Sequence, residues 1–350
     1  MKQNTEADKQ TRLTNLDFFK GICMAFIIFT HYTWSKDEQL KMLFPFWIDM
    51  AVPALMIITG YVYSYIEFGK KGRTDLASLY NPKQIIAKLI RFLIPYILFF
   101  ILDIIVFVFI QGNEKTVFEC IKLFLTGGVG PGSFYVPVMI QIVLILPLVS
   151  YTCYKFRRGG VLIWFALNVL FEIVQTVVHM SDDLYRLCSL RYLLCLGTGC
   201  YFYFGFLEQW EKKESKRQLI ILSAAGIVGV IYIVVYNYTD NIPIITNKWT
   251  TTSVFASLYI VPIMYFLIHH CKGLNNKVIE LMGKASFNIY LVQMFYYMAF
   301  SKVIYSLFDS VPLRIIINLV SCVCVGIVYY YLEYPITKKV IKRIRETMYE

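Results

Sequence analysis

Long apolar runs separated by basic loops constrain this chain more than any other feature of its sequence. A helix of about 20 apolar residues spans the hydrocarbon core of a bilayer, and runs of that length recur along the whole chain. Charged residues make up only 16% of the sequence, whereas soluble domains carry about a quarter. We therefore predict an all-α, polytopic membrane protein with about ten transmembrane helices. The predicted spans lie near residues 14–34, 45–67, 88–110, 134–154, 160–179, 186–206, 217–237, 250–270, 284–305 and 312–335.

The basic residues indicate which ends of these spans face the cytoplasm. If the N-terminus is inside, most of the 34 Lys and Arg residues fall in cytoplasmic segments. Because positive charge concentrates on the cytoplasmic side and the span count is even, both termini are predicted to be cytoplasmic. The net charge of +11 is then a topological signal, so we expect the lipid bilayer as a partner and no nucleic acid. The basic residues left outside are Lys36, Lys41, Lys115, Lys122, Arg186, Arg191, Lys248, Lys302 and Arg314.

Two further features limit the chemistry. The nine cysteines contain no C-x-x-C pair, which argues against a metal site and a disulfide framework. The longest external connection, residues 111–133, ends in the sequence TGGVGPGS at 126–133. Such a glycine-rich segment cannot continue a helix. It predicts either a shaped loop or a flexible connector.

The first span carries three ionisable residues on one helical face. Asp17 lies one turn before Lys20, and His31 lies about 1100° of helical rotation and about 16 Å of rise beyond Lys20. Ionisable groups inside a membrane span are costly, so each is a functional candidate. Two structural alternatives stay open, because His31 could be an interfacial residue and Lys20 could extend to the cytoplasmic interface.

A second polar face lies in the fifth span, where Asn168, Glu172, Gln175 and His179 share one side of the helix. Glu172 is near mid-bilayer and must be protonated, paired or exposed to water there. The face indicates a cavity wall, or polar contacts between helices. Further polar positions lie in or beside spans, and most of them are interpreted as packing or anchoring groups. They are Asp49, Arg91, Asp103, Gln141, Arg191, Gln293 and Glu333.

In several motifs, the sequence resembles the bacterial acyltransferase family 3. The strongest is LDFFKG at 16–21 followed by His31, which is similar to the opening pattern of a basic residue, ten intervening positions and a histidine. The others follow in the family's order along the whole chain. They are VPALMIITGY (52–61), KLIRFLIPY (88–96), RYLLCLGTG (191–199), GKASFNIYLVQ (283–293) and LEYPITK (332–338).

The sequence departs from the family pattern at four places. Lys20 replaces the usual arginine, Thr59 the usual serine, and Gln293 the histidine of many relatives. The segment before the fourth span lacks the common tryptophan. Because an amide cannot exchange protons near neutral pH as an imidazole can, any acid–base role at position 293 is lost or reassigned.

The resemblance implies one transmembrane acyltransferase domain over residues 1–350, with cytoplasmic tails at 1–13 and 336–350. It implies an O-acyltransferase of the bacterial plasma membrane that uses cytoplasmic acyl-coenzyme A, with acetyl the expected group. The acceptor would be a hydroxyl of an extracytoplasmic glycan or another cell-envelope molecule. No metal is expected.

The same resemblance suggests roles for individual residues. His31 is the expected general base or transient acyl carrier, supported at the donor end by Lys20 and Asp17. Arg91 and Lys88 are the candidates for binding the coenzyme A phosphates. The acceptor candidates are Glu172, Arg191 and Gln293.

Other classes of protein stay open at this point. A transporter or flippase for a glycan or lipid-linked precursor also has about ten helices and intramembrane charges. The absence of a recognisable internal repeat and the pattern of Lys20 and His31 favour the enzyme. A sensing or scaffold subunit without activity gains support from Gln293. The sequence is compatible with a homo-oligomer, and it identifies neither the acceptor nor the acyl group.

Overall fold

The computed structural model describes residues 6–110, 112, 115–207, 212–239, 253–271, 273–274 and 276–347. Within these ranges every regular element is helical and none is a strand, which confirms the all-α class. Helices suit a bilayer because each satisfies its backbone hydrogen bonds within one segment.

The described part of the chain forms sixteen α-helices. In the first half of the chain they are α1 (Glu6–Thr30), α2 (Lys36–Lys41), α3 (Ala51–Ser64), α4 (Leu76–Leu79), α5 (Pro82–Ile104), α6 (Val117–Thr126) and α7 (Tyr135–Phe156). The second half adds α8 (Arg158–Val177), α9 (Asp182–Leu187), α10 (Leu193–Leu207), α11 (Lys212–Tyr238), α12 (Val254–His270), α13 (Lys277–Lys284), α14 (Ser286–Ala299), α15 (Ser301–Leu307) and α16 (Val311–Thr347). Turns of π-helix extend α3 over Tyr65–Lys70 and α5 over Ile105–Ile110, and 3-10 turns lie at Phe44–Phe46 and Ser189–Tyr192.

Six helices among the described residues are long and apolar enough to cross a membrane, so the chain is a multi-pass membrane protein. They comprise Phe44–Lys70, Leu76–Val108, Tyr135–Phe156, Arg158–Val177, Arg217–Tyr238 and Val311–Ile344. A shorter apolar helix covers Val254–His270. The count of about ten spans and the orientation stay predictions.

The structure changes several predicted boundaries. The first span ends as a helix at Thr30, before His31, and the ninth is interrupted at Ala285 and again at Phe300. The predicted connection at 111–133 contains the helix α6, which the sequence analysis did not anticipate. The predicted C-terminal tail is helical, because α16 continues to Thr347.

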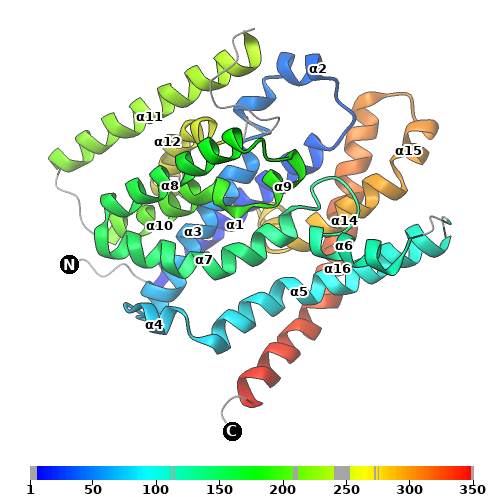
Figure 1. Cartoon of the computed structure of the whole chain (residues 1–350), viewed down its shortest axis with the longest axis horizontal. Helices are drawn as coiled ribbons and strands as arrows, with labels where there is room; N and C mark the ends of the chain where they lie inside the picture. Colours follow the sequence, from blue (N-terminus) through cyan, green and yellow to red (C-terminus); the bar gives the residue numbers. More distant parts are fainter. Residues whose placement is uncertain are drawn as a thin grey trace.

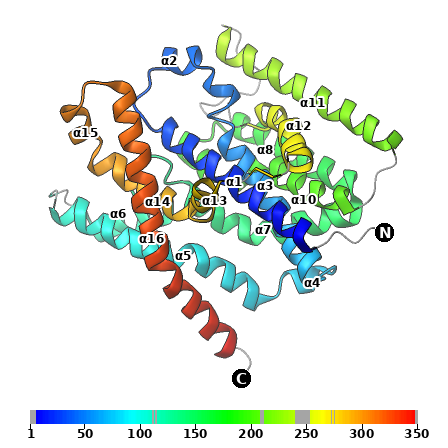
Figure 2. The same cartoon turned by 180° about the vertical axis from the view of Figure 1, so that it is seen from behind.

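The helices form one bundle, and different elements lie at its two ends (Figures 1 and 2). α3 and α10 pack against each other in the interior, and α11 lies at the edge against α12. α14 packs between α1 and α16. The beginning of α1 and α4 lie at one end of the bundle, whereas α2 and α15 lie at the other.

The helices α1 and α13 approach each other closely. A Cβ at Gly21 would overlap the carbonyl oxygen of Ile279, and a Cβ at Gly283 would overlap the carbonyl oxygen of Asp17. Both glycines therefore allow the two backbones to touch. This contact fixes the position of Asp17 and the rest of α1 against the C-terminal half of the chain.

We expect Gly283→Ala to destabilise the protein by about 1–3 kcal/mol, because the added methyl group overpacks the contact between α1 and α13. A lower melting temperature of the detergent-purified protein would measure this. Gly159→Ala is the matched control, since its Cβ would meet only Phe156 at 3.6 Å, and a helical alanine is otherwise favoured over glycine by about 1 kcal/mol. Equal melting temperatures for the two variants would contradict the close approach.

Candidate active site

The three ionisable residues of α1 fall into two separate groups. Lys20 Nζ lies 2.5 Å from Asp17 Oδ1, and both side chains are partly buried. His31 follows the end of the helix, where its amide donates to the carbonyl of Ile28 at 3.3 Å. A rise of 1.5 Å per residue separates Lys20 from His31 by about 16 Å. The predicted group is therefore an ion pair in the middle of α1 and a histidine just beyond its C-terminal end.

The His31 imidazole lies between α14 and the glycine-rich loop 126–133. Its Nε2 is 3.3 Å from the position that a Cβ would occupy on Gly132. The ring of Tyr297 stands edge-on to it, with centroids 6.1 Å apart, and the Tyr297 hydroxyl donates to the Ile28 carbonyl at 2.7 Å. No hydrogen bond joins the imidazole to another residue in the described part of the chain. A nitrogen that can accept or carry a proton is thus left available beside a residue with no side chain.

The glycine-rich loop has a defined shape, which favours the first of the two sequence interpretations. Gly132 has φ +85°, and its carbonyl accepts a hydrogen bond from the Tyr290 hydroxyl. A Cβ on Gly130 would lie 2.6 Å from the carbonyl oxygen of Met294. Glycine is needed at both positions, because one has a left-handed conformation and the other touches the backbone of α14.

Asp103 of α5 lies against the other side of this loop. Its Oδ2 is 3.4 Å from the position that a Cβ would occupy on Gly128, and the residue is 1% exposed. The second oxygen, Oδ1, has no partner among the described residues. Sequence reasoning assigned Asp103 to packing or anchoring. The missed signal was a carboxylate in the middle of an apolar run that faces a glycine-rich segment.

Gln293 of α14 is fully buried, and neither atom of its amide has a hydrogen-bond partner among the described residues. It lies on the helix between Tyr290 and Tyr297, the two tyrosines that flank the loop and His31. A buried polar group without a partner costs about 1–3 kcal/mol. Gln293 is therefore a candidate for binding a ligand that supplies both a donor and an acceptor.

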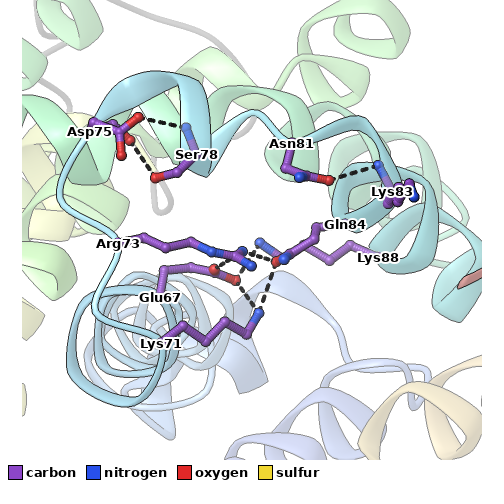
Figure 3. A network of polar contacts seen from close by, with 9 residues as sticks. All are labelled: Glu67, Lys71, Arg73, Asp75, Ser78, Asn81, Lys83, Gln84 and Lys88. Carbon is purple, nitrogen blue, oxygen red and sulfur yellow. Dashed lines mark hydrogen bonds and ion pairs between the residues drawn. The ribbon is translucent and has the colours of Figure 1, made fainter. Parts of the chain in front are cut away.

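At the opposite end of the bundle, three cations surround one buried carboxylate (Figure 3). Glu67 lies 3.0 Å from Lys71, 2.8 Å from Arg73 and 2.9 Å from Lys88. Gln84 accepts further hydrogen bonds from Lys71 and Arg73. One carboxylate cannot neutralise three cations. The cluster is therefore net positive and suits a phosphate-bearing ligand.

Of the two residues predicted to bind the donor, Lys88 lies in this cluster and Arg91 lies at the surface. Lys88 belongs to the cluster and also lies over the ring of Tyr63, 4.0 Å from its centroid. Arg91, one turn further along α5, is exposed and does not join the ion pairs of Glu67. Sequence reasoning used Lys71 and Arg73 only as signals of topology, so it missed that they converge on Glu67.

The polar face of α8 is buried against neighbouring helices. Glu172 is 1% exposed and accepts a hydrogen bond of 2.8 Å from the Tyr185 hydroxyl of α9. The Arg191 guanidinium lies 4.8 Å from the ring centroids of both Tyr185 and Tyr192. Two of the three predicted acceptor residues, Glu172 and Arg191, are thus engaged with the same tyrosine.

Asn168 on this face accepts a hydrogen bond of 3.1 Å from the Leu194 amide of α10. His179 does not extend the face, because α8 ends at Val177 and His179 is exposed with φ +49°. The contacts of Asn168 and Glu172 match the interpretation of polar contacts between helices.

Comparison with known proteins identifies the family. A model of acyltransferase family 3, described as an acyltransferase domain, matches residues 13–331. No curated protein and no solved structure matches the chain. The matched range includes His31, the glycine-rich loop and the Glu67 cluster. The chain therefore belongs to acyltransferase family 3, and it is a multi-pass membrane acyltransferase.

Proposed function

We propose that this acyltransferase moves an acyl group, with acetyl the expected group, from cytoplasmic acyl-coenzyme A to a hydroxyl of an extracytoplasmic glycan or another cell-envelope molecule. The plasma membrane of a bacterium is the proposed location. The observation that carries the proposal is the environment of His31, whose Nε2 lies beside Gly132 and is bonded to no described residue.

A free imidazole nitrogen provides the base that acyl transfer requires. His31 takes the proton of the acceptor hydroxyl while that oxygen attacks the thioester carbonyl. The tetrahedral intermediate then expels coenzyme A as a thiolate, which receives the proton from the imidazolium. The alternative of a transient acyl carrier uses the same nitrogen as the nucleophile.

The donor is proposed to bind at the end of the bundle that carries the Glu67 cluster. Lys71, Arg73 and Lys88 give this end an excess of positive charge, and Arg91 adds an exposed cation one turn away. The beginning of α1 and α4 lie at the same end (Figures 1 and 2). Basic groups there suit the phosphates of coenzyme A.

Among the acceptor candidates, Gln293 is the best supported. Its buried amide lacks a partner among the described residues, whereas Glu172 already binds the Tyr185 hydroxyl and Arg191 lies against the same ring. An amide donates and accepts, as a hydroxyl does. We propose that Gln293 binds the acceptor, and that Glu172 and Arg191 shape its surroundings.

We expect His31→Ala to reduce acyl transfer by about 100-fold or more, because a general base contributes factors of that order. Transfer of radiolabel from acetyl-coenzyme A to envelope material would be measured in membrane vesicles. His179→Ala, on an exposed residue outside the site, should retain activity at the same protein level. Substantial transfer by an inserted His31→Ala protein would remove the assigned role. A transporter would leave the thioester uncleaved in the wild type as well.

We expect Gly132→Ala to reduce transfer by about tenfold or more, because its methyl group would lie 3.3 Å from His31 Nε2 and displace a reacting group. Gly112→Ala is the matched control. Gly112 also has a positive φ, +67°, but nothing lies within 4 Å of its Cβ position. Equal activities of the two variants would show that backbone strain, and not access to His31, explains any loss.

We expect Arg91→Ala and Lys88→Ala to raise the apparent KM for acetyl-coenzyme A by about tenfold, which corresponds to one lost charge-assisted contact of about 1.4 kcal/mol. The value of kcat should change little, since neither residue lies near His31. Lys115→Ala, an exposed cation near the other end of α5, is the control. An unchanged KM in either variant would exclude that residue from the donor site.

A further inference from the structure

The helix α6 folds back along α5 instead of projecting from the bundle (Figures 1 and 2). The ring of Phe124 stacks on Tyr96 and meets Phe100 edge-on, with centroids 5.2 Å apart in both pairs. The Tyr96 hydroxyl donates to the Phe124 carbonyl at 2.7 Å. α5 and α6 therefore form a helical hairpin.

The contacts of Phe124 give the depth that this hairpin reaches. The sequence 92–110 of α5 and its π-helical extension is apolar, with Asp103 its one charged residue, and its length matches the hydrocarbon core of a bilayer. Phe100 lies about 15 Å before the end of this segment at Ile110, from the rise per residue of a helix. Phe124, packed against Phe100, thus lies near the middle of the membrane.

The surface of α6 agrees with such a position. Val117, Phe118, Ile121 and Leu125 share one helical face and are 78%, 76%, 52% and 66% exposed. That face adjoins the one that packs on α5. The polar arc of the helix is narrow, with Glu119 and Lys122. An arc of apolar residues this exposed is disfavoured in water.

α5 provides an internal comparison for this surface. It is one of the membrane-spanning helices, and it exposes a similar apolar face that must contact lipid. The residues of that face are Ile97, Leu98, Ile101, Leu102 and Ile105. The exposed face of α6 has the same chemistry and lies on the same hairpin, so acyl chains are the partner that fits it.

The chain beyond α6 is non-helical at membrane depth, which a bilayer tolerates only where the backbone is buried in protein or lines a cavity. The glycine-rich loop meets this condition. The Gly128 amide donates to the Leu123 carbonyl at 2.8 Å, and the Gly132 carbonyl accepts from the Tyr290 hydroxyl.

We propose that α6 and the glycine-rich loop form a re-entrant hairpin in the half of the membrane where α5 ends, with the face of Val117, Phe118, Ile121 and Leu125 in contact with phospholipid acyl chains. The hairpin holds the loop against His31 below the membrane surface. It replaces the external connection expected at 111–133.

Photo-crosslinking to lipid tests this proposal. p-Benzoylphenylalanine would replace Phe118, and the full-length protein would be reconstituted into vesicles of radiolabelled phosphatidylethanolamine and phosphatidylglycerol. After irradiation, label on the protein at position 118 should be within about twofold of that at position 101 of α5, and about fivefold or more above that at position 122 on the polar arc. The same replacement at Val117 gives an independent second position.

Two outcomes would overturn the proposal. Label at positions 117 and 118 as low as at position 122 would place the face in water. Crosslinking of these positions mainly to a second copy of the chain, seen as a band of twice the mass, would show that protein covers the face instead of lipid.

Discussion

The requirement that every backbone group be satisfied inside a bilayer governs this structure. It explains why the described chain is helical throughout and why its departures from helix are few and local. These departures are informative. α1 ends at Thr30, the loop at 126–133 interrupts the path between α6 and α7, and Gly132 of that loop lies beside His31. The candidate site is built where the helices stop, because only there can a backbone turn bring a glycine against an imidazole.

Three acidic side chains inside the protein likewise have a partner. Glu67 has three cations, Asp17 has Lys20, and Glu172 has the Tyr185 hydroxyl. An unpartnered polar group in a low-dielectric interior is destabilising. Several buried polar atoms nevertheless lack a hydrogen-bond partner among the described residues, and they include both amide atoms of Gln293 and one oxygen of Asp103. Both adjoin elements that contact the glycine-rich loop, which is consistent with a site that keeps binding capacity for a substrate.

The sequence predicted the helical class and the family because hydropathy and short motifs are local signals. It could not predict α6, since its ten residues are too few for a span and carry Glu119 and Lys122. Nor could it predict that Gly132 would meet His31, because no periodicity links residues that far apart. In the sequence, Lys71 and Arg73 indicated only the topology of the chain. In the structure, the π-helical turn at Tyr65–Lys70 and the residues after it bring both cations to Glu67. Arg91 was expected in a binding site and is exposed beside it.

The length of α1 constrains the proposed reaction. The ion pair of Asp17 and Lys20 and the imidazole of His31 are separated by about 16 Å along one helix, so the pair cannot touch a thioester that reacts at His31. Lys20 could then act only on a part of the donor distant from the acyl group, or on the position of α1 itself. The contact of the Asp17 carbonyl with Gly283 favours the second role for this part of the helix. In the proposed reaction, the chemistry is concentrated at His31, and the basic end of the bundle retains the donor while its extended arm reaches that residue.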